Sequence, residues 1–337
     1  MGPVSNSPTG TPEAGKYLST KAKVSLNAYQ AYGLSIHTDL ICPELLPFPH
    51  SSHEPDVTIT MLGEEATLLS SLPERSYEVR PGCFQLDVRR VARYRVEEGR
   101  RILIQAHASA SPEKVRLFLL GSAMSALLYQ RGLLPLHGSA VETRWGGMIF
   151  VGPQGSGKST LAAEFHSHGY RLLSDDVCAV ESTPNGLRIL PALAQFRLCA
   201  VAYQKLGASP EAYFDVDKFA VSMGKQYCPH PVPLKAVHIL SYQSAEGPRF
   251  EVLRGLERVR RLFENLYRPQ FLIGQRTQND LVCLAGLIAQ RTTLAAVSRR
   301  RDRTAAADLV KFLEVAWAEC FGTSFNAGEE FDAHFRS

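Results

Sequence analysis

Residues 150–160 read FVGPQGSGKST, and residues 152–159 within them fill every fixed position of the phosphate-loop pattern G-x-x-x-x-G-K-[ST]. The apolar run at 146–152 predicts a strand before the loop. Residues 158–168 predict a helix after it, which stops at Gly169. A strand before and a helix after are the context in which this pattern binds phosphate. The stretch therefore predicts an α/β fold with a nucleotide at the loop.

The loop suits phosphate because glycine backbone can curl around its oxygens where the unpaired N–H groups of a helix begin. Lys158 is expected to reach the β- and γ-phosphates, and the Ser159 hydroxyl to ligate Mg²⁺. The predicted nucleotide-contacting residues are Gly152, Pro153, Gln154, Gly155, Ser156, Gly157, Lys158, Ser159 and Thr160.

Two adjacent carboxylates, Asp175 and Asp176, follow an apolar strand, seventeen and eighteen residues after Lys158. One carboxylate can hold Mg²⁺ while the other takes a proton from an attacking hydroxyl. An Asp-Asp pair can also simply end a strand, but beside an intact phosphate loop the catalytic interpretation is favoured. His137, in LLPLHGSAV, comes 21 residues before Lys158, and a strand hairpin would carry it back toward the loop.

Features of ordinary GTPases and motor-like ATPases are missing from the sequence. Those families place a second, metal-side aspartate at the end of another apolar strand, whereas LKAVHILSYQ at 234–243 ends without an acid. Guanine-selective proteins add an N-K-x-D motif, which TQND at 277–280 does not match. Both classes are therefore disfavoured.

The composition indicates a globular protein. The chain has 337 residues, of which 45% are apolar, and no run approaches eighteen consecutive apolar residues. The N-terminus lacks the pattern of a secretory signal, so we expect a cytoplasmic protein without a membrane partner. The net charge of +4 does not favour nucleic acid, and the clusters RRVARYR, RVRRLF and RRRDR are interpreted as solvated faces.

The seven cysteines are spread singly, with no metal-ligand spacing to the ten histidines, and are predicted to be reduced thiols.

Composition and periodicity divide the chain into five parts. Short β-like runs predict a mostly β module at 17–110, after a polar tail at 1–16. A buried connecting helix is predicted at 111–132, with Ser111 as its cap and Pro112 in its first turn. An α/β domain follows at 133–325, and a tail at 326–337. Within the α/β domain we expect strands at 170–181, 187–198 and 234–242, and helices at 256–266, 279–292 and 305–320.

The order LHGSAV, MIFVGPQGSGKST, LAAEFHSHGYRLLSDDVCAV resembles the HPr serine kinase/phosphorylase family. The resemblance implies a phosphate-loop kinase core of the HPr kinase/PEP carboxykinase-like type, using ATP and Mg²⁺. It implies that Asp176 is the base, that Asp175 and Ser159 hold the metal, and that His137 supports the acidic pair or the transferring phosphate. The E-x-R-G-L-G signature expected near residue 200 is replaced by LAQFRLCAV, which leaves Arg197 as the candidate cation for a phosphate or a substrate carboxylate.

The stretches YGLSI…PEL at 32–45 and VRLFLLGSA…RGLLPLHGSAV at 115–141 are similar to HPr-kinase-related proteins found with lasso peptide biosynthesis. This resemblance implies a kinase for a serine hydroxyl, with the C-terminal serine of a precursor peptide as acceptor and the N-terminal module facing the peptide or an assembly. A carrier-protein kinase/phosphorylase and a nucleotide-gated binding protein remain alternatives. The sequence leaves open whether the chain forms a homo-oligomer.

Overall fold

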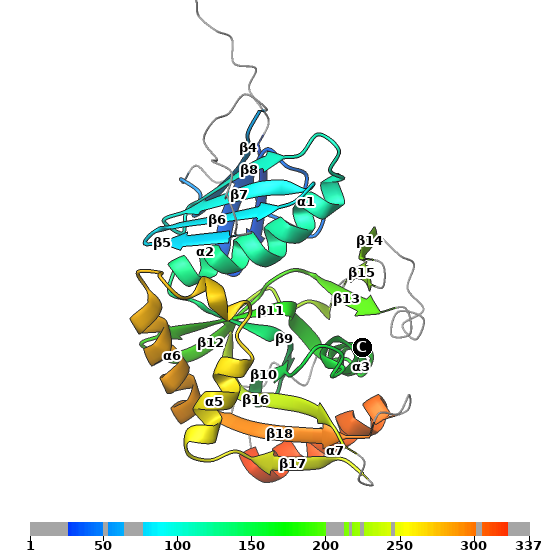
Figure 1. Cartoon of the computed structure of the whole chain (residues 1–337). Coiled ribbons are helices and arrows are strands. Elements are labelled where there is room, and N and C mark those ends of the chain that lie inside the picture. The colour runs from blue at the N-terminus through cyan, green and yellow to red at the C-terminus, as the bar shows by residue number, and fades with distance from the viewer. Residues whose placement is uncertain are drawn as a thin grey trace, which may run out of the picture.

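The structure is a computed structural model that describes residues 26–49, 53–63, 77–199, 212–215, 218–222, 226–243, 247–300 and 305–322. Within these residues the fold is mixed α/β, which confirms the predicted class at this level. Two large sheets lie on either side of a buried helical segment (Figure 1). The predicted tails at 1–16 and 326–337 fall outside the described residues.

The first sheet has eight strands among the described residues, in the order β3-β1-β2-β4-β8-β7-β6-β5. Alternate residues face the core, as in β7, where Tyr94 and Val96 are fully buried. Its strands are β1 (Asn27–Ala31), β2 (Leu34–Thr38), β3 (Leu46–Pro47), β4 (Val57–Met61), β5 (Tyr77–Arg80), β6 (Cys83–Val88), β7 (Ala92–Glu97) and β8 (Arg101–Ala106).

The helical segment between the sheets consists of α1 (Pro112–Phe118), a π-helical turn (Leu119–Ala123) and α2 (Met124–Gln130). The Ser111 hydroxyl accepts a hydrogen bond from the Lys114 N–H, and Pro112 occupies the first turn, as expected. Most of its side chains are buried, and one apolar cluster continues from the first sheet through this segment into the second sheet.

The second sheet carries the phosphate-loop sequence. Among the described residues its order is β10-β9-β11-β12-β16-β18-β17, and β10 also pairs with β16, so five of its strands close on themselves. Strands β10, β16 and β18 are parallel neighbours. The strands are β9 (Leu134–Thr143), β10 (Gly146–Val151), β11 (Arg171–Thr183), β12 (Gly186–Leu190), β16 (Val232–Tyr242), β17 (Arg249–Val252) and β18 (Thr293–Arg299).

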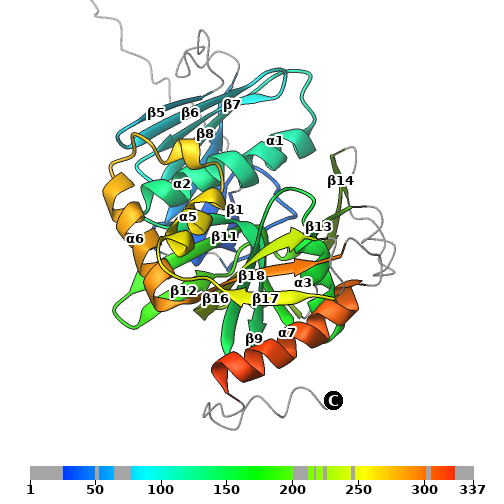
Figure 2. The same cartoon turned by 60° about the horizontal axis from the view of Figure 1, so that its bottom comes forward.

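Helices cover this sheet (Figure 2). Helix α3 (Lys158–Ser167) packs with α7 (Ala305–Phe321) in an aromatic cluster in which Trp317 stacks on Phe150 and Phe165. The remaining helices are α5 (Leu256–Glu264), a 3-10 turn (Pro269–Phe271) and α6 (Gln278–Arg291). A small sheet of β13 (Gln195–Cys199), β15 (Lys218–Ser222) and β14 (Ala212–Asp215) lies to one side (Figure 1).

Two sequence expectations need correction. The stretch 187–198 is not one strand: it divides at Pro191 into β12 and β13, which belong to different sheets, because proline cannot donate to a strand ladder. Residues 293–299, for which the sequence analysis predicted no element, form β18 in the parallel part of the second sheet.

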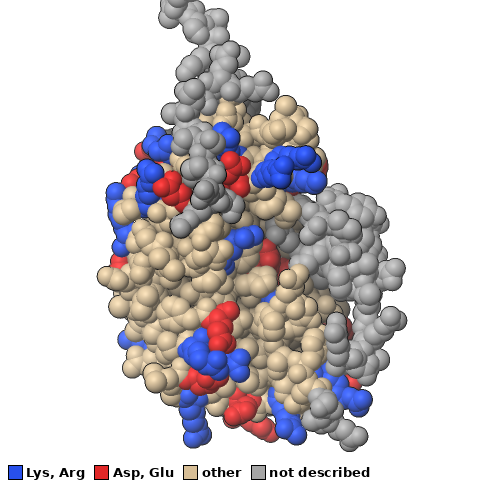
Figure 3. Space-filling model, in the orientation of Figure 1, with Lys and Arg blue, Asp and Glu red and all other residues tan. Residues whose placement is uncertain are grey.

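The charged residues are mostly interspersed on the face shown in Figure 3. In α5, Arg260 pairs with both Glu257 and Glu264, which agrees with the interpretation of RVRRLF as a solvated face. Arg299, the first residue of RRRDR, is instead buried. No helix in the described part of the chain is long and apolar enough to cross a membrane.

Candidate nucleotide site

The phosphate-loop sequence connects β10 to α3, as predicted. Gly152, Gly155 and Gly157 have φ angles of 144°, 80° and 88°, which side-chain-bearing residues rarely adopt. A Cβ on Gly152 would also lie 2.5 Å from the Leu240 carbonyl oxygen. The glycines therefore permit a tight curl that ends at the N-terminus of α3.

The Lys158 ammonium lies inside this curl. Its Nζ donates hydrogen bonds to the carbonyl oxygens of Gly152, at 2.8 Å, and Pro153, at 3.1 Å, and the residue is only 8% exposed. The Ser156 hydroxyl is also buried and has no hydrogen-bond partner within the described residues. A phosphate oxygen in the loop would offer both groups an acceptor.

The remaining loop residues are more accessible. Pro153, Gln154 and Gly155 are exposed, whereas Ser159 and Thr160 in the first turn of α3 are half-buried.

The register of three strands brings the acid pair to the loop. On β9, Gly138 lies between Val151, the last residue of β10, and Asp176 of β11. Ser139, the next residue on β9, lies between Phe150 of β10 and Asp175 of β11. Asp176 has a φ of 81°, a left-handed conformation that interrupts the regular alternation of side chains along β11.

Asp175 is 3% exposed, and its Oδ1 accepts a short hydrogen bond, 2.6 Å, from the Ser139 hydroxyl.

His137 is close to Asp176. Its Nδ1 lies 3.5 Å from the Asp176 carboxylate and 3.2 Å from the Asp176 carbonyl oxygen. The His137 backbone N–H donates to the Asn265 carbonyl, and its ring lies 5.6 Å from the Tyr267 ring. The structure thus brings His137 close to Asp176, one member of the predicted acid pair.

The pKa of the buried Cys178 thiol is influenced by charges from both the loop and the acid pair. Burial raises its pKa most, the charges of Asp175 and Asp176 raise it further, and the Lys158 charge lowers it.

Two residues that were not predicted from the sequence, Tyr242 and Arg299, end β16 and β18, which run parallel to β10. They face each other across β16 and β18, with the guanidinium 5.5 Å from the tyrosine ring. A Cβ on Gly157 would collide with the Arg299 guanidinium, which places that cation against the loop. Arg299 is 6% exposed, and its Nε has no hydrogen-bond partner within the described residues.

A signal for these residues exists in the sequence. Parallel strands direct their carboxyl ends to one edge, where open α/β sheets bind ligands. A strand at 293–299 parallel to β10 would place its last residue, Arg299, at the same edge of the sheet as the phosphate loop.

Arg197 lies on β13, opposite Ala220 of β15. Its side chain falls outside the described part of the chain, so its substrate role remains a prediction.

The donors near the loop suit a hard cation. Asp175 and Ser159 offer a carboxylate and a hydroxyl, which are the oxygen ligands that Mg²⁺ prefers. The Ser139 hydroxyl donates to Oδ1 of Asp175 and so orients this carboxylate. The residues therefore fit the predicted metal.

The chain matches no protein-family model. It also matches no curated protein. Among solved structures, the HPr(Ser) kinase/phosphatase from Coxiella burnetii is similar to 56% of this chain and 93% of its own, with 11% identity and a TM-score of 0.33. A similarity of this size does not decide what the site does.

Proposed function

We propose that the protein is an ATP- and Mg²⁺-dependent kinase that transfers the γ-phosphate to a serine hydroxyl. The proposed acceptor is the C-terminal serine of a lasso precursor peptide. The observation that supports the proposal is the pairing of Asp176 with Gly138 and of Gly138 with Val151, which leaves Asp176 two strands from the residue that precedes the phosphate loop.

In this proposal the loop holds the nucleotide. Lys158 exchanges its bonds to the loop carbonyls for the β- and γ-phosphates, and the Ser156 hydroxyl gains an acceptor. The Arg299 guanidinium lies against Gly157 and adds a second cation beside the loop. Bound Mg²⁺, held by Ser159 and Asp175, would neutralise charge on the phosphates.

Asp176 is the proposed general base. Its carboxylate accepts the proton of the serine hydroxyl as the serine oxygen bonds to the γ-phosphorus and the bond to the ADP oxygen breaks. His137 is a positioning residue, because its Nδ1 lies within reach of both the carboxylate and the backbone carbonyl of Asp176. Phosphoryl transfer otherwise requires mainly alignment and charge neutralisation.

The test is mass spectrometry of candidate precursor peptides incubated with the protein and Mg²⁺-ATP. We expect a single phosphate mass on the C-terminal serine. Asp176→Asn keeps the shape but removes the base, so the rate should fall by about 10²–10⁴-fold while nucleotide affinity changes little. Asp280→Asn, an exposed acid in the first turn of α6, is the matched control.

Three outcomes contradict parts of the proposal. Phosphorylation of a carrier protein but of no peptide would favour the carrier-protein kinase. Tight nucleotide binding without any phosphorylated acceptor would favour a nucleotide-gated binding protein. Full activity of Asp176→Asn would remove the base from Asp176 and make His137 the next candidate.

A further inference from the structure

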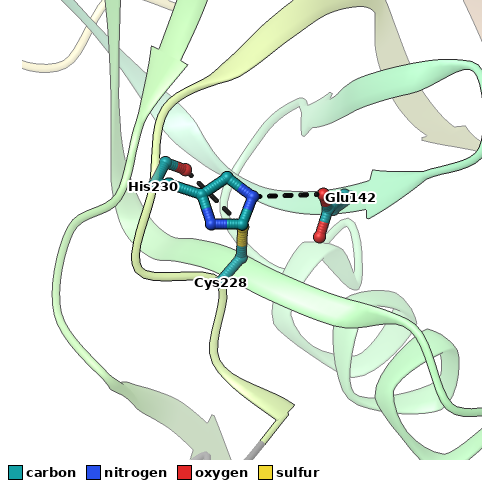
Figure 4. A group of neighbouring side chains, drawn as sticks. All are labelled: Glu142, Cys228 and His230. Carbon is teal, nitrogen blue, oxygen red and sulfur yellow. Dashed lines mark hydrogen bonds and ion pairs between the residues drawn. The ribbon is translucent and has the colours of Figure 1, made fainter. Parts of the chain in front are cut away.

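Three side chains with metal-binding chemistry meet at the other end of β9 from His137 (Figure 4). Glu142 lies near the end of β9, and Cys228 and His230 lie on the segment that leads into β16. Their ligand atoms all lie within 4.8 Å of one another. The cysteine and histidine spacing in the sequence does not reveal this group, because the third ligand comes from a distant strand.

The segment that carries Cys228 and His230 is held in place by the backbone. The Cys228 N–H donates to the Leu172 carbonyl oxygen of β11 at 2.8 Å, and Tyr227 forms a β-bridge with Leu172. The Tyr227 hydroxyl donates to the Ala192 carbonyl oxygen at 3.0 Å. The thiol and the imidazole are therefore presented to Glu142 by an ordered backbone.

Two of the three separations match those between the ligands of one tetrahedral ion. Cys228 Sγ lies 3.5 Å from His230 Nε2, which lies 3.6 Å from Glu142 Oε1. Zinc bonds of about 2.0–2.3 Å at tetrahedral angles separate neighbouring ligand atoms by roughly 3.3–3.6 Å. The third pair, the Cys228 sulfur and a Glu142 carboxylate oxygen, lies within 4.8 Å, so small side-chain rotations would let one ion bind all three residues.

The kind of ligand selects the metal. A thiolate, an imidazole and one carboxylate suit Zn²⁺, whereas Mg²⁺ and Ca²⁺ prefer oxygen alone. The other oxygen of Glu142, Oε2, lies 2.6 Å from Arg171 Nε, although the N–H does not point along the line of a hydrogen bond. This ion pair leaves Oε1 directed at His230 and acts as an outer-shell partner for the carboxylate.

We propose that Glu142, Cys228 and His230 form a Zn²⁺ site that is separate from the nucleotide site. Binding replaces the thiol proton of Cys228, which is released to solvent, with a sulfur–zinc bond. Cys228 is buried and Glu142 nearly so, while the His230 side chain is 53% exposed, so the fourth coordination position opens toward solvent for water.

The zinc site would fasten the chain entering β16 to β9. The five residues from His137 to Glu142 span roughly 16 Å of extended strand, so the ion does not touch the nucleotide. Its effect would be on stability, because a ligand that binds the folded state alone raises the free energy of unfolding.

The test is titration of the full-length protein, purified without a polyhistidine tag and with reduced thiols, with Zn²⁺ and separately with Co²⁺. We expect one Zn²⁺ per chain by calorimetry and a sulfur-to-cobalt charge-transfer absorption with Co²⁺. Cys228→Ser, a near-isosteric change, should weaken Zn²⁺ binding by about 100-fold or more, since even outer-shell changes cost 10–100-fold. Cys283→Ser, at an exposed cysteine of α6, is the matched control.

Stability gives a second measurement. Zn²⁺ should raise the melting temperature of wild type and of Cys283→Ser, but not that of Cys228→Ser. His230→Gln should also lose the Zn²⁺ effect, while its exposed side chain makes misfolding a small risk. Zn²⁺ binding by Cys228→Ser with wild-type affinity, or failure of the folded wild type to bind Zn²⁺ at micromolar concentration, would mean that the three side chains form a hydrogen-bonded cluster alone.

Discussion

Acid should destabilise the protein through His238, which lies on β16 beside the strand that leads into the phosphate loop. This residue of β16 is fully buried, pairs with Phe150 of β10, and stacks on Phe150 and Trp317. The Trp317 indole N–H donates to His238 Nε2 at 2.9 Å, which assigns the ring proton to Nδ1, and Nδ1 has no partner among the described residues. Burial lowers the pKa of His238 to about 3.

The size of the effect follows from proton linkage. In the unfolded chain the histidine pKa is about 6.5, so between that pH and pH 3 the unfolded state binds one more proton than the folded state. The free energy of unfolding therefore falls as the pH falls, by about 1.4 kcal/mol per pH unit. From pH 7 to pH 5 the loss from His238 alone amounts to about 2 kcal/mol.

Urea denaturation at pH 7 and pH 5 measures this loss, and a variant isolates it. His238→Gln remains neutral over the range and has an amide oxygen that can accept from Trp317. It lowers stability at both pH values, so the comparison is of differences: wild type should lose about 2 kcal/mol more than the variant between pH 7 and pH 5. The contributions of other titrating groups, such as His166, are the same in both proteins and cancel in this comparison. Equal losses in both proteins would show that His238 is protonated in the folded state near its ordinary pKa.

Three further predictions concern the nucleotide site. Lys158→Ala should abolish phosphoryl transfer with the melting temperature nearly unchanged, because its ammonium binds loop carbonyls rather than the core; a folded, fully active variant would contradict the phosphate-loop assignment. Asp175→Asn should raise the Mg²⁺ concentration for half-maximal activity, and an unchanged Mg²⁺ titration would remove Asp175 from the metal. Arg299→Met should weaken ATP binding by about 10-fold, measured by calorimetry, whereas Arg300→Met at the exposed neighbour should not; equal affinities would mean that Arg299 does not touch phosphate.

Local patterns predicted the elements around the loop. The helix expected at 158–168 is α3 (Lys158–Ser167), and the capping role of Ser111 is confirmed by its bond to the Lys114 N–H. These features depend on residues within a few positions of one another, where backbone propensity and capping chemistry decide.

Contacts between distant segments could not be predicted in the same way. Arg299 reads as part of a solvated basic cluster until β18 is placed beside β16. From the sequence alone, Glu142 is indistinguishable from an ordinary acidic residue on a strand. Its metal-binding partners become visible only in the structure, where the segment with Cys228 and His230 packs beside it. Both cases depend on strand order, which a single sequence specifies only through the packing of the whole sheet.

His137 and Asp176 show where the limit lies within one site. Thr143 pairs with Gly146, so a two-residue turn joins β9 to β10 and fixes their register: position 138 is opposite 151, and His137 falls level with the first loop glycine. That placement follows from the hairpin alone and was accessible from the sequence. Asp176 lies opposite the neighbouring Gly138 only because the β9–β11 register shifts between Leu172 and Ser174, and its own φ is also positive. Without the register shift, every later side chain of β11 would exchange faces. The position of the Asp176 carboxylate therefore depends on one extra residue in β11, which no periodic pattern in the sequence reveals.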